Sequence, residues 1–99
     1  MKMVLVVCNT YFVDRLRTLL KANAIDYYTS WDKATGKGRG TELHLGAGAY
    51  GSTNTVTMIA FEDEAPLEAL IRGIGEANQE IPRAADRIRL IQLPLERIV

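Results

Sequence analysis

The chain has little of what a disulfide-bonded or nucleic-acid-binding protein requires. Its 99 residues contain one cysteine, and 12 Lys plus Arg balance 12 Asp plus Glu. A single cysteine excludes an intrachain disulfide, fits a reducing compartment and favours a cytoplasmic location, with Cys8 as an ordinary residue at a strand end. Zero net charge argues against nucleic acid as the main partner, because such binding needs a basic excess.

Long apolar runs and clusters of metal ligands are also absent from the sequence. No run approaches the roughly 20 residues of a membrane span, so no integral membrane protein is expected. The apolar segment 3–7 is too short for a signal peptide and polar residues follow it at once, so it is interpreted as a buried strand. His44 has no Cys or His cluster to join, so a structural or solvent-facing role is expected and no metal site is predicted.

The spacing of apolar residues predicts two helices among four strands. A first helix, capped by Asn9 or Thr10, is expected to begin near Tyr11, and a second follows the acidic residues 62–64. The apolar stripe of the second helix consists of Leu67, Leu70, Ile71 and Ile74. Runs rich in β-branched and aromatic residues predict strands at 3–7, 25–31, 55–61 and 87–93.

This order of elements predicts a single α+β domain over residues 1–99 with the ferredoxin-like order βαββαβ. Right-handed crossings would place both helices on one face of a four-stranded antiparallel sheet. The other face would expose Val, Ile, Leu and aromatic side chains, which is a liability in water. We therefore predict a homo-oligomer that buries this face against other copies of the chain.

A glycine-rich segment separates the second and third strands, and residues 33–53 are expected to form a long flexible loop. Within it, Gly36, Lys37, Gly38, Arg39 and Gly40 combine permissive backbone with two positive charges. Such a combination can bind a phosphate or a carboxylate, although a solvated hairpin tip fits the pattern equally well. The spacing matches neither a Walker loop nor a dinucleotide fingerprint. Residues 41–45 alternate and would extend the strand.

Basic residues also gather near the C-terminus, at Arg83, Arg87, Arg89 and Arg97. One interpretation is protection of an edge strand together with exposed salt bridges. The other is that one or two of them, taken as Arg87 and Arg89, face a cleft shared with the glycine-rich loop. A phosphate-bearing ligand would then meet arginines and backbone amides together.

Two segments resemble the PII nitrogen-regulatory signalling family. Residues 41–47, Thr-Glu-Leu-His-Leu-Gly-Ala, are similar to the Thr-Glu-Ile/Leu-Tyr-Arg-Gly-Ala run of that family's long T-loop. In the family a stretch containing glycine, arginine and lysine precedes this run, as residues 36–40 do here. Residues 88–96 resemble the family's last core strand, and the order of elements agrees over nearly the whole chain.

The resemblance implies a non-enzymatic regulator. Such a protein is a homotrimer that binds a small-molecule effector in clefts between subunits and engages a target protein, a transporter or an enzyme, through its T-loop. The implied effector is an adenine nucleotide (ATP, ADP or AMP) or another small anion, with no further cofactor. By position, Lys37 or Arg39 matches the basic T-loop residue, Arg89 a phosphate-binding lysine, and Thr29 a threonine near the adenine pocket.

The chain departs from the PII pattern at the phosphate-binding B-loop. Residues 78–86 stand where that glycine-rich loop would be, and they contain no glycine. The tyrosine that is modified in some members has no aligned counterpart, since Tyr50 lies one position away. We therefore expect a PII-like relative rather than a standard PII protein.

Two alternative functions share the expected fold. One is a CutA-like trimeric divalent-metal tolerance protein, for which this sequence offers few metal ligands. The other is a small ferredoxin-like enzyme such as an acylphosphatase or a cofactor-free monooxygenase. An acylphosphatase would need a glycine-rich arginine loop directly after the first strand, where residues 9–11 are Asn-Thr-Tyr.

Overall fold

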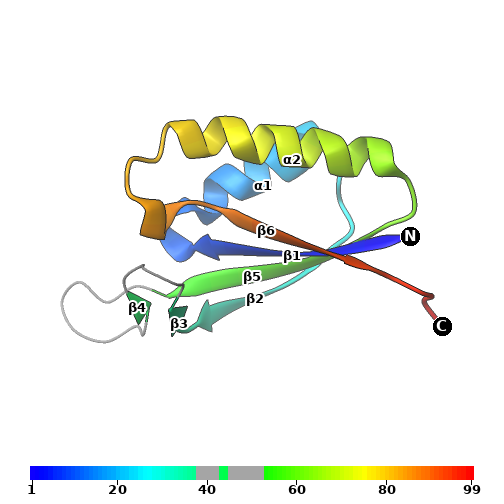
Figure 1. Ribbon diagram of the computed structural model, residues 1–99, viewed down its shortest axis with the longest axis horizontal. Helices are drawn as coiled ribbons and strands as arrows, with labels where there is room; N and C mark the ends of the chain where they lie inside the picture. Colours follow the sequence, from blue (N-terminus) through cyan, green and yellow to red (C-terminus); the bar gives the residue numbers. More distant parts are fainter. Residues whose placement is uncertain (38–42, 45–52) are drawn as a thin grey trace.

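The structure is organised around a four-stranded antiparallel sheet. A computed structural model describes residues 1–37, the backbone of 43–44, and 53–99. The near-continuous apolar run of strand β1 (Lys2–Asn9) suits a strand at the middle of a sheet. Its neighbours give the order β2-β5-β1-β6 (Figure 1). The four strands are β1 (Lys2–Asn9), β2 (Thr29–Ala34), β5 (Asn54–Phe61) and β6 (Arg89–Pro94).

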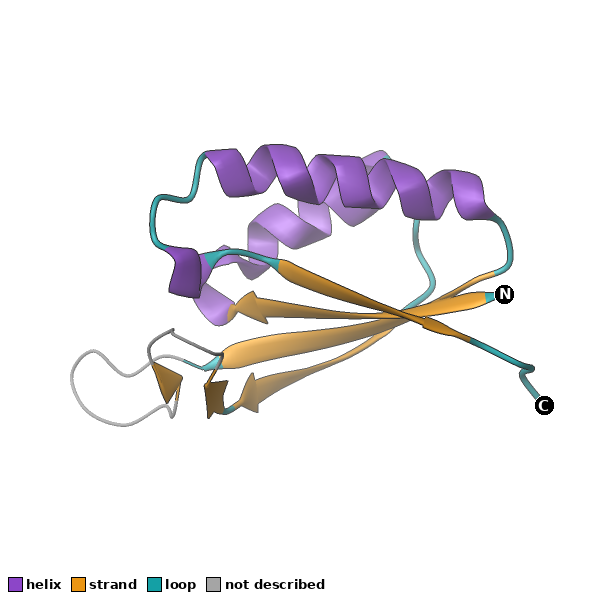
Figure 2. Cartoon of the chain, viewed as in Figure 1, coloured by secondary structure: helices purple, strands orange, loops and turns teal. Residues whose placement is uncertain are grey.

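Both α-helices of the described chain, α1 (Val13–Ala22) and α2 (Glu64–Gln79), lie on one face of this sheet (Figure 2). Neither has the length and apolar character that a membrane crossing requires. Alternate residues of β1 point at the helices and are fully buried there. The core includes Val4, Val6, Cys8, Leu16, Leu20, Ile59, Phe61, Leu67, Leu70 and Ile74. This arrangement confirms the predicted ferredoxin-like βαββαβ fold. Three residues of the predicted apolar stripe on α2 are buried, and the fourth, Ile71, is 36% exposed.

The beginning of β2 is the largest correction to the predicted boundaries. The expected strand at 25–31 begins only at Thr29. The N–H of Ile25 donates to the carbonyl of Leu20 at 2.9 Å, and Ala24 has a left-handed φ of 56°. These features form a turn that closes the end of α1. Residues 25–28 are therefore a connection, in which the Tyr27 ring packs edge-on against Phe61 at 6.0 Å between centroids.

Two other predicted boundaries also move. A 3₁₀ turn, η1 (Thr10–Phe12), precedes α1, so the α-helix begins two residues after the expected Tyr11. The predicted cap is present, since Asn9 Oδ1 accepts a hydrogen bond from the Tyr11 N–H at 3.0 Å, but it caps this 3₁₀ turn. Strand β6 begins at Arg89 instead of residue 87. A second 3₁₀ turn, η2 (Ala84–Asp86), precedes it, and both backbone groups of Ile88 bond to the side chain of Asn78 and not to a strand.

A short hairpin extends the sheet region after β2. Strand β3 (Gly36–Lys37) pairs with β4 (Leu43–His44), with Gly36 opposite His44 and Lys37 opposite Leu43. Part of the expected strand at 41–45 is therefore paired, whereas residues 41, 42 and 45 lie outside the described residues. Residues 33–34, which the sequence predicts to lie in the loop, form the end of β2 after a break in its register.

The sheet face that carries no helix exposes a continuous apolar surface. We call it the open face. Cross-strand pairing places these side chains next to one another, because Leu5 lies opposite both Met58 and Ile91. Trp31, Met58, Ile91 and Leu93 are between 37% and 47% exposed. The open face consists of Met3, Leu5, Val7, Trp31, Val56, Met58, Ile91 and Leu93.

The helices approach each other closely at one glycine of α2. A Cβ at Gly73 would lie 2.9 Å from Leu19 Cδ2, whereas a Cβ at Gly75 would meet nothing within 4 Å. Glycine is a weak helix former at both positions. Replacement of Gly75 therefore tests helix propensity alone, whereas replacement of Gly73 also tests the packing against Leu19.

Gly75→Ala should therefore stabilise the protein by about 0.5–1 kcal/mol, the usual gain for alanine over glycine inside a helix. Gly73→Ala should gain at least roughly 0.5 kcal/mol less, because Leu19 must move to admit the new methyl group. Urea unfolding of the two variants beside the unchanged chain measures both effects. An equal gain at both positions would show that the helices are not in close contact at Gly73.

Candidate functional site

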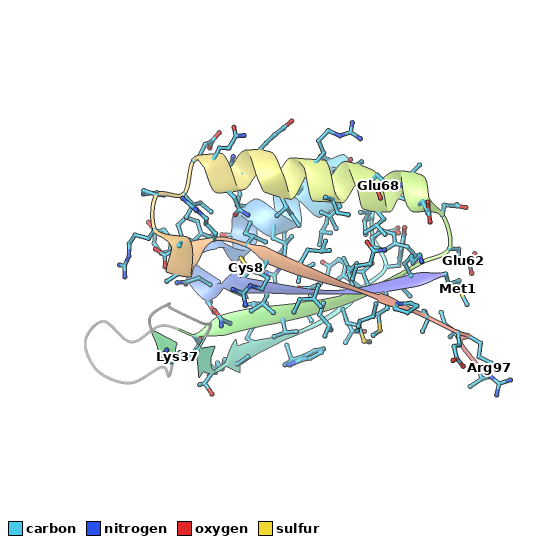
Figure 3. All side chains as sticks on the ribbon, in the orientation of Figure 1. Met1, Cys8, Lys37, Glu62, Glu68 and Arg97 are labelled. Carbon is cyan, nitrogen blue, oxygen red and sulfur yellow. The ribbon has the colours of Figure 1, made fainter. Side chains whose placement is uncertain are left out.

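A cavity of about 270 Å³ opens on the open face of the sheet, at the end where β1 finishes and β6 begins. It lies at the opposite end of the sheet from Met1, and Figure 3 shows Lys37 there. Its walls come from β1, β5 and β6, from the end of β2 and the adjoining β3, and from η2. The described residues that line it are Val7, Asn9, Ala34, Thr35, Gly36, Lys37, Asn54, Val56, Ala84, Ala85, Arg87, Arg89 and Ile91.

The sheet register brings these distant residues together. Val7 lies directly opposite Val56 on one side and Arg89 on the other, and Asn9 lies opposite Asn54. Side chains of directly paired residues stand on the same face, about 4.5–5.5 Å apart at Cβ. The floor of the cavity is therefore a patch of three neighbouring strands.

The described lining of the cavity is positively charged. Lys37, Arg87 and Arg89 line it, and among its described lining residues none is acidic. The chain as a whole has no net charge, so this concentration of cations is local. A concave site lined by one sign of charge attracts ligands of the opposite sign, and guanidinium groups suit carboxylates and phosphates. The arrangement fits a small anion.

Arg87 is fixed in place by its own neighbourhood. Its Nε donates to the carbonyl of Ile81 at 3.0 Å, and one terminal nitrogen donates to the carbonyl of Pro82 at 3.4 Å. A guanidinium has five N–H donors, so others remain for a ligand. Within residues 1–37 and 53–99, no hydrogen bond or ion pair engages the side chain of Arg89.

Asn9 and Thr10 tie two walls of the cavity to the end of β1. Asn9 Nδ2 donates to Asp86 Oδ1 at 3.1 Å, which secures η2. The Thr10 N–H and hydroxyl donate to the carbonyl of Thr53 at 2.9 Å and 2.8 Å, which secures the chain as it enters β5. Asn9 and Thr10 thus stabilise two walls of the cavity, although the sequence predicted them only as helix caps.

Half of the ligand-binding residues predicted from the sequence lie together in the structure. Gly36, Lys37, Arg87 and Arg89 line one cavity. Thr29 stands on the same sheet face, opposite Met58, but does not belong to the lining. Gly38, Arg39 and Gly40 lie outside the described residues.

Several lining residues were missed from the sequence. Val56 and Ile91 had no signal beyond membership of a predicted strand, and Asn54 stands immediately before the strand predicted at 55–61. For Asn9, the only signal was its predicted role as a helix cap. Among the residues that the structure describes, no group of three His, Cys, Asp or Glu side chains is placed to hold a metal ion.

Comparison with known proteins supports the fold. No family model and no curated protein matches the chain. Solved structures that match include CPII from Thiomonas intermedia K12 bound to ADP and bicarbonate, with 14% identity and a TM-score of 0.68. The same protein, described as a nitrogen regulatory PII-like protein and bound to ADP, AMP and bicarbonate, matches at 14% identity and a TM-score of 0.70. Each match covers 97% of this chain and 88% of the other. The predicted resemblance to a PII-like protein is therefore confirmed at the level of fold.

Cys8 lies on the opposite side of β1 from the cavity and faces the helices (Figure 3). Burial raises the pKa of its thiol from 9.0 to about 12. The thiol therefore stays neutral at physiological pH, and a neutral thiol is a poor nucleophile.

The Cys8 thiol should react with a disulfide reagent such as Ellman's on the order of a hundredfold more slowly in the native protein than in the urea-unfolded chain at pH 8. Because its pKa is raised on folding, its contribution to stability is complete below pH 9 and is lost as the pH rises from 9 towards 12. Cys8→Ala should remove that part of the alkaline loss. Rapid native labelling would contradict the buried, neutral thiol.

Proposed function

From the fold shared with CPII and the cation-lined cavity, we propose that this chain is a non-enzymatic PII-like regulator whose effector is a small anion or an adenine nucleotide. The observation that carries the proposal is the convergence of Lys37, Arg87 and Arg89 on one cavity without an acidic residue among its described lining. CPII is bound to ADP, AMP and bicarbonate, all of which are anions. The chemistry of this cavity suits the same class.

The size of the cavity favours a site completed by a second subunit. Pockets for ligands of drug size usually enclose about 300–1,000 Å³. At about 270 Å³, this cavity accommodates a small oxyanion or the phosphate portion of a nucleotide. The cavity opens on the open face, so a second copy packed on that apolar surface would bring further residues to its rim. The proposed assembly is the homotrimer that the resemblance implies.

The proposed output of the site runs through the segment 33–53. Gly36 and Lys37 belong both to the cavity lining and to the start of this segment. An anion that contacts Lys37 therefore touches the root of the segment that corresponds to the T-loop. We propose that ligand binding changes how this segment engages a target protein, a transporter or an enzyme, in cytoplasmic nitrogen regulation.

Arg89→Gln should weaken binding of ADP by about 10- to 100-fold, because a hydrogen bond to a charged group contributes about 1.5–3 kcal/mol. Arg89 has no partner among residues 1–37 and 53–99, so the fold should be unaffected. Isothermal titration calorimetry with ADP, AMP and bicarbonate measures the affinities. Arg72→Gln, an exposed arginine on α2, is the matched control and should bind like the unchanged chain. If the unchanged chain binds none of the three compounds, the proposed ligand class is wrong.

The assembly can be tested with two equally exposed apolar residues. Met58 on the open face is 37% exposed and Ile71 on α2 is 36% exposed. Light scattering after gel filtration should give three times the 11.0 kDa chain mass for the unchanged protein. Met58→Glu should shift this mass towards the monomer, because it places a charge in the proposed interface, and Ile71→Glu should not. A monomeric unchanged chain would contradict the proposed trimer.

A further inference from the structure

The segment that joins α2 to β6 contains no glycine-rich loop, and hydrogen bonds from side chains hold its backbone. Residues 76–99 contain no glycine. Residues 80–89 nevertheless turn from helix to strand and carry two of the three cationic side chains of the cavity, Arg87 and Arg89. Something other than permissive backbone must therefore hold these arginines in place.

Asn78, near the end of α2, makes two hydrogen bonds with the backbone of one residue in this segment. Its Nδ2 donates to the carbonyl of Ile88 at 2.8 Å, and its Oδ1 accepts from the Ile88 N–H at 2.8 Å. An amide that engages both backbone groups of one residue copies the pairing that a neighbouring strand supplies. The side chain of Ile88 is 3% exposed and belongs to the core. Ile88 is thus fixed through its backbone and its side chain.

The two arginines flank this fixed residue. Successive side chains of an extended chain point to opposite sides, and Arg87 has an extended backbone with φ −69° and ψ 146°. Because Ile88 faces the core, Arg87 and Arg89 both face the cavity. Arg87 is held further by its bond to the carbonyl of Ile81, whose N–H in turn donates to the carbonyl of Asn78 at 3.1 Å.

We propose that Asn78 is a positioning residue for anion binding: by holding Ile88 it directs Arg87 and Arg89 into the cavity. This inference rests on the proposed function and deepens it, since it names the residue that prepares the site without lining it. A long cationic side chain loses conformational freedom when it binds a ligand, and ordering its backbone beforehand reduces that cost. Asn78 takes over a role that glycine-rich loops fulfil elsewhere with backbone geometry.

Asn78→Ala removes both hydrogen bonds to Ile88, and Asn78→Asp keeps the shape but loses the donor to the Ile88 carbonyl. Each should raise the dissociation constant for ADP, by about tenfold for Asn78→Ala. The matched control is Asn23→Ala, because Asn23 Nδ2 also donates to a carbonyl near a helix end, that of Leu19 at 2.9 Å, and none of the hydrogen bonds given for Asn23 reaches the segment 80–89. Asn23→Ala should leave the ADP affinity unchanged. Equal losses in the two alanine variants would overturn the proposal, because they would reflect general destabilisation.

A double-mutant cycle separates positioning from a structural role. In the Arg89→Gln background, Asn78→Ala should weaken ADP binding by clearly less than tenfold, because one of the two arginines that it positions is gone. Full additivity of the two changes would overturn the proposal. If Asn78→Ala does not fold, Asn78→Asp serves in the same cycle.

A readout that needs no ligand distinguishes this inference from the proposed function. The Arg87 Nε–H donates to the carbonyl of Ile81, so its NMR signal should exchange slowly with water in the unchanged chain. Exchange should be several-fold faster in Asn78→Ala, in line with loss of a local constraint, and unchanged in Asn23→Ala. If the unchanged chain binds no ADP, the proposed function fails while this exchange rate still decides the role of Asn78. An Arg87 signal unaffected by Asn78→Ala would overturn that role.

Discussion

The pairing of β1 with both β5 and β6 is the constraint on which the rest of the molecule depends. Because side chains alternate along a strand, this pairing sends Val4 and Val6 into the core and Leu5 and Val7 to the open face. The same register sets Val7 beside Arg89 and so builds the cavity floor. A slip of one residue would move the core side chains of the slipped strand to the open face, and its open-face side chains to the core.

The order of elements could be predicted because the spacing of apolar residues is a local property of the sequence. The apolar run of β1 and the buried Leu67, Leu70 and Ile74 of α2 lie where their periodicity indicates. The prediction failed at residues 25–28, whose composition is typical of a strand. There Ile25 is buried by a turn that closes α1, and no local pattern distinguishes that burial from burial in a sheet.

The candidate site could be predicted only in part. Charge and glycine content identified Gly36, Lys37, Arg87 and Arg89, since such residues suit anions wherever they lie. Asn9 and Val56 could not be identified, because strand register alone brings them to the cavity. The resemblance to the PII family implies a role for Thr29, which faces the same side of the sheet but stands outside the lining. The contribution of Asn78 depends on contact with a residue ten positions later, which no motif encodes.

Holding a cavity wall with a side-chain amide affects how such a site can diverge during evolution. A glycine-rich loop must retain its glycines, because other residues rarely adopt their backbone angles. The wall here has no such requirement, so Ala84 and Ala85 could be replaced widely as long as Asn78 still holds Ile88. Relatives with this construction would share no recognisable loop motif, and their kinship would be visible in three-dimensional comparison well after it had faded from the sequence.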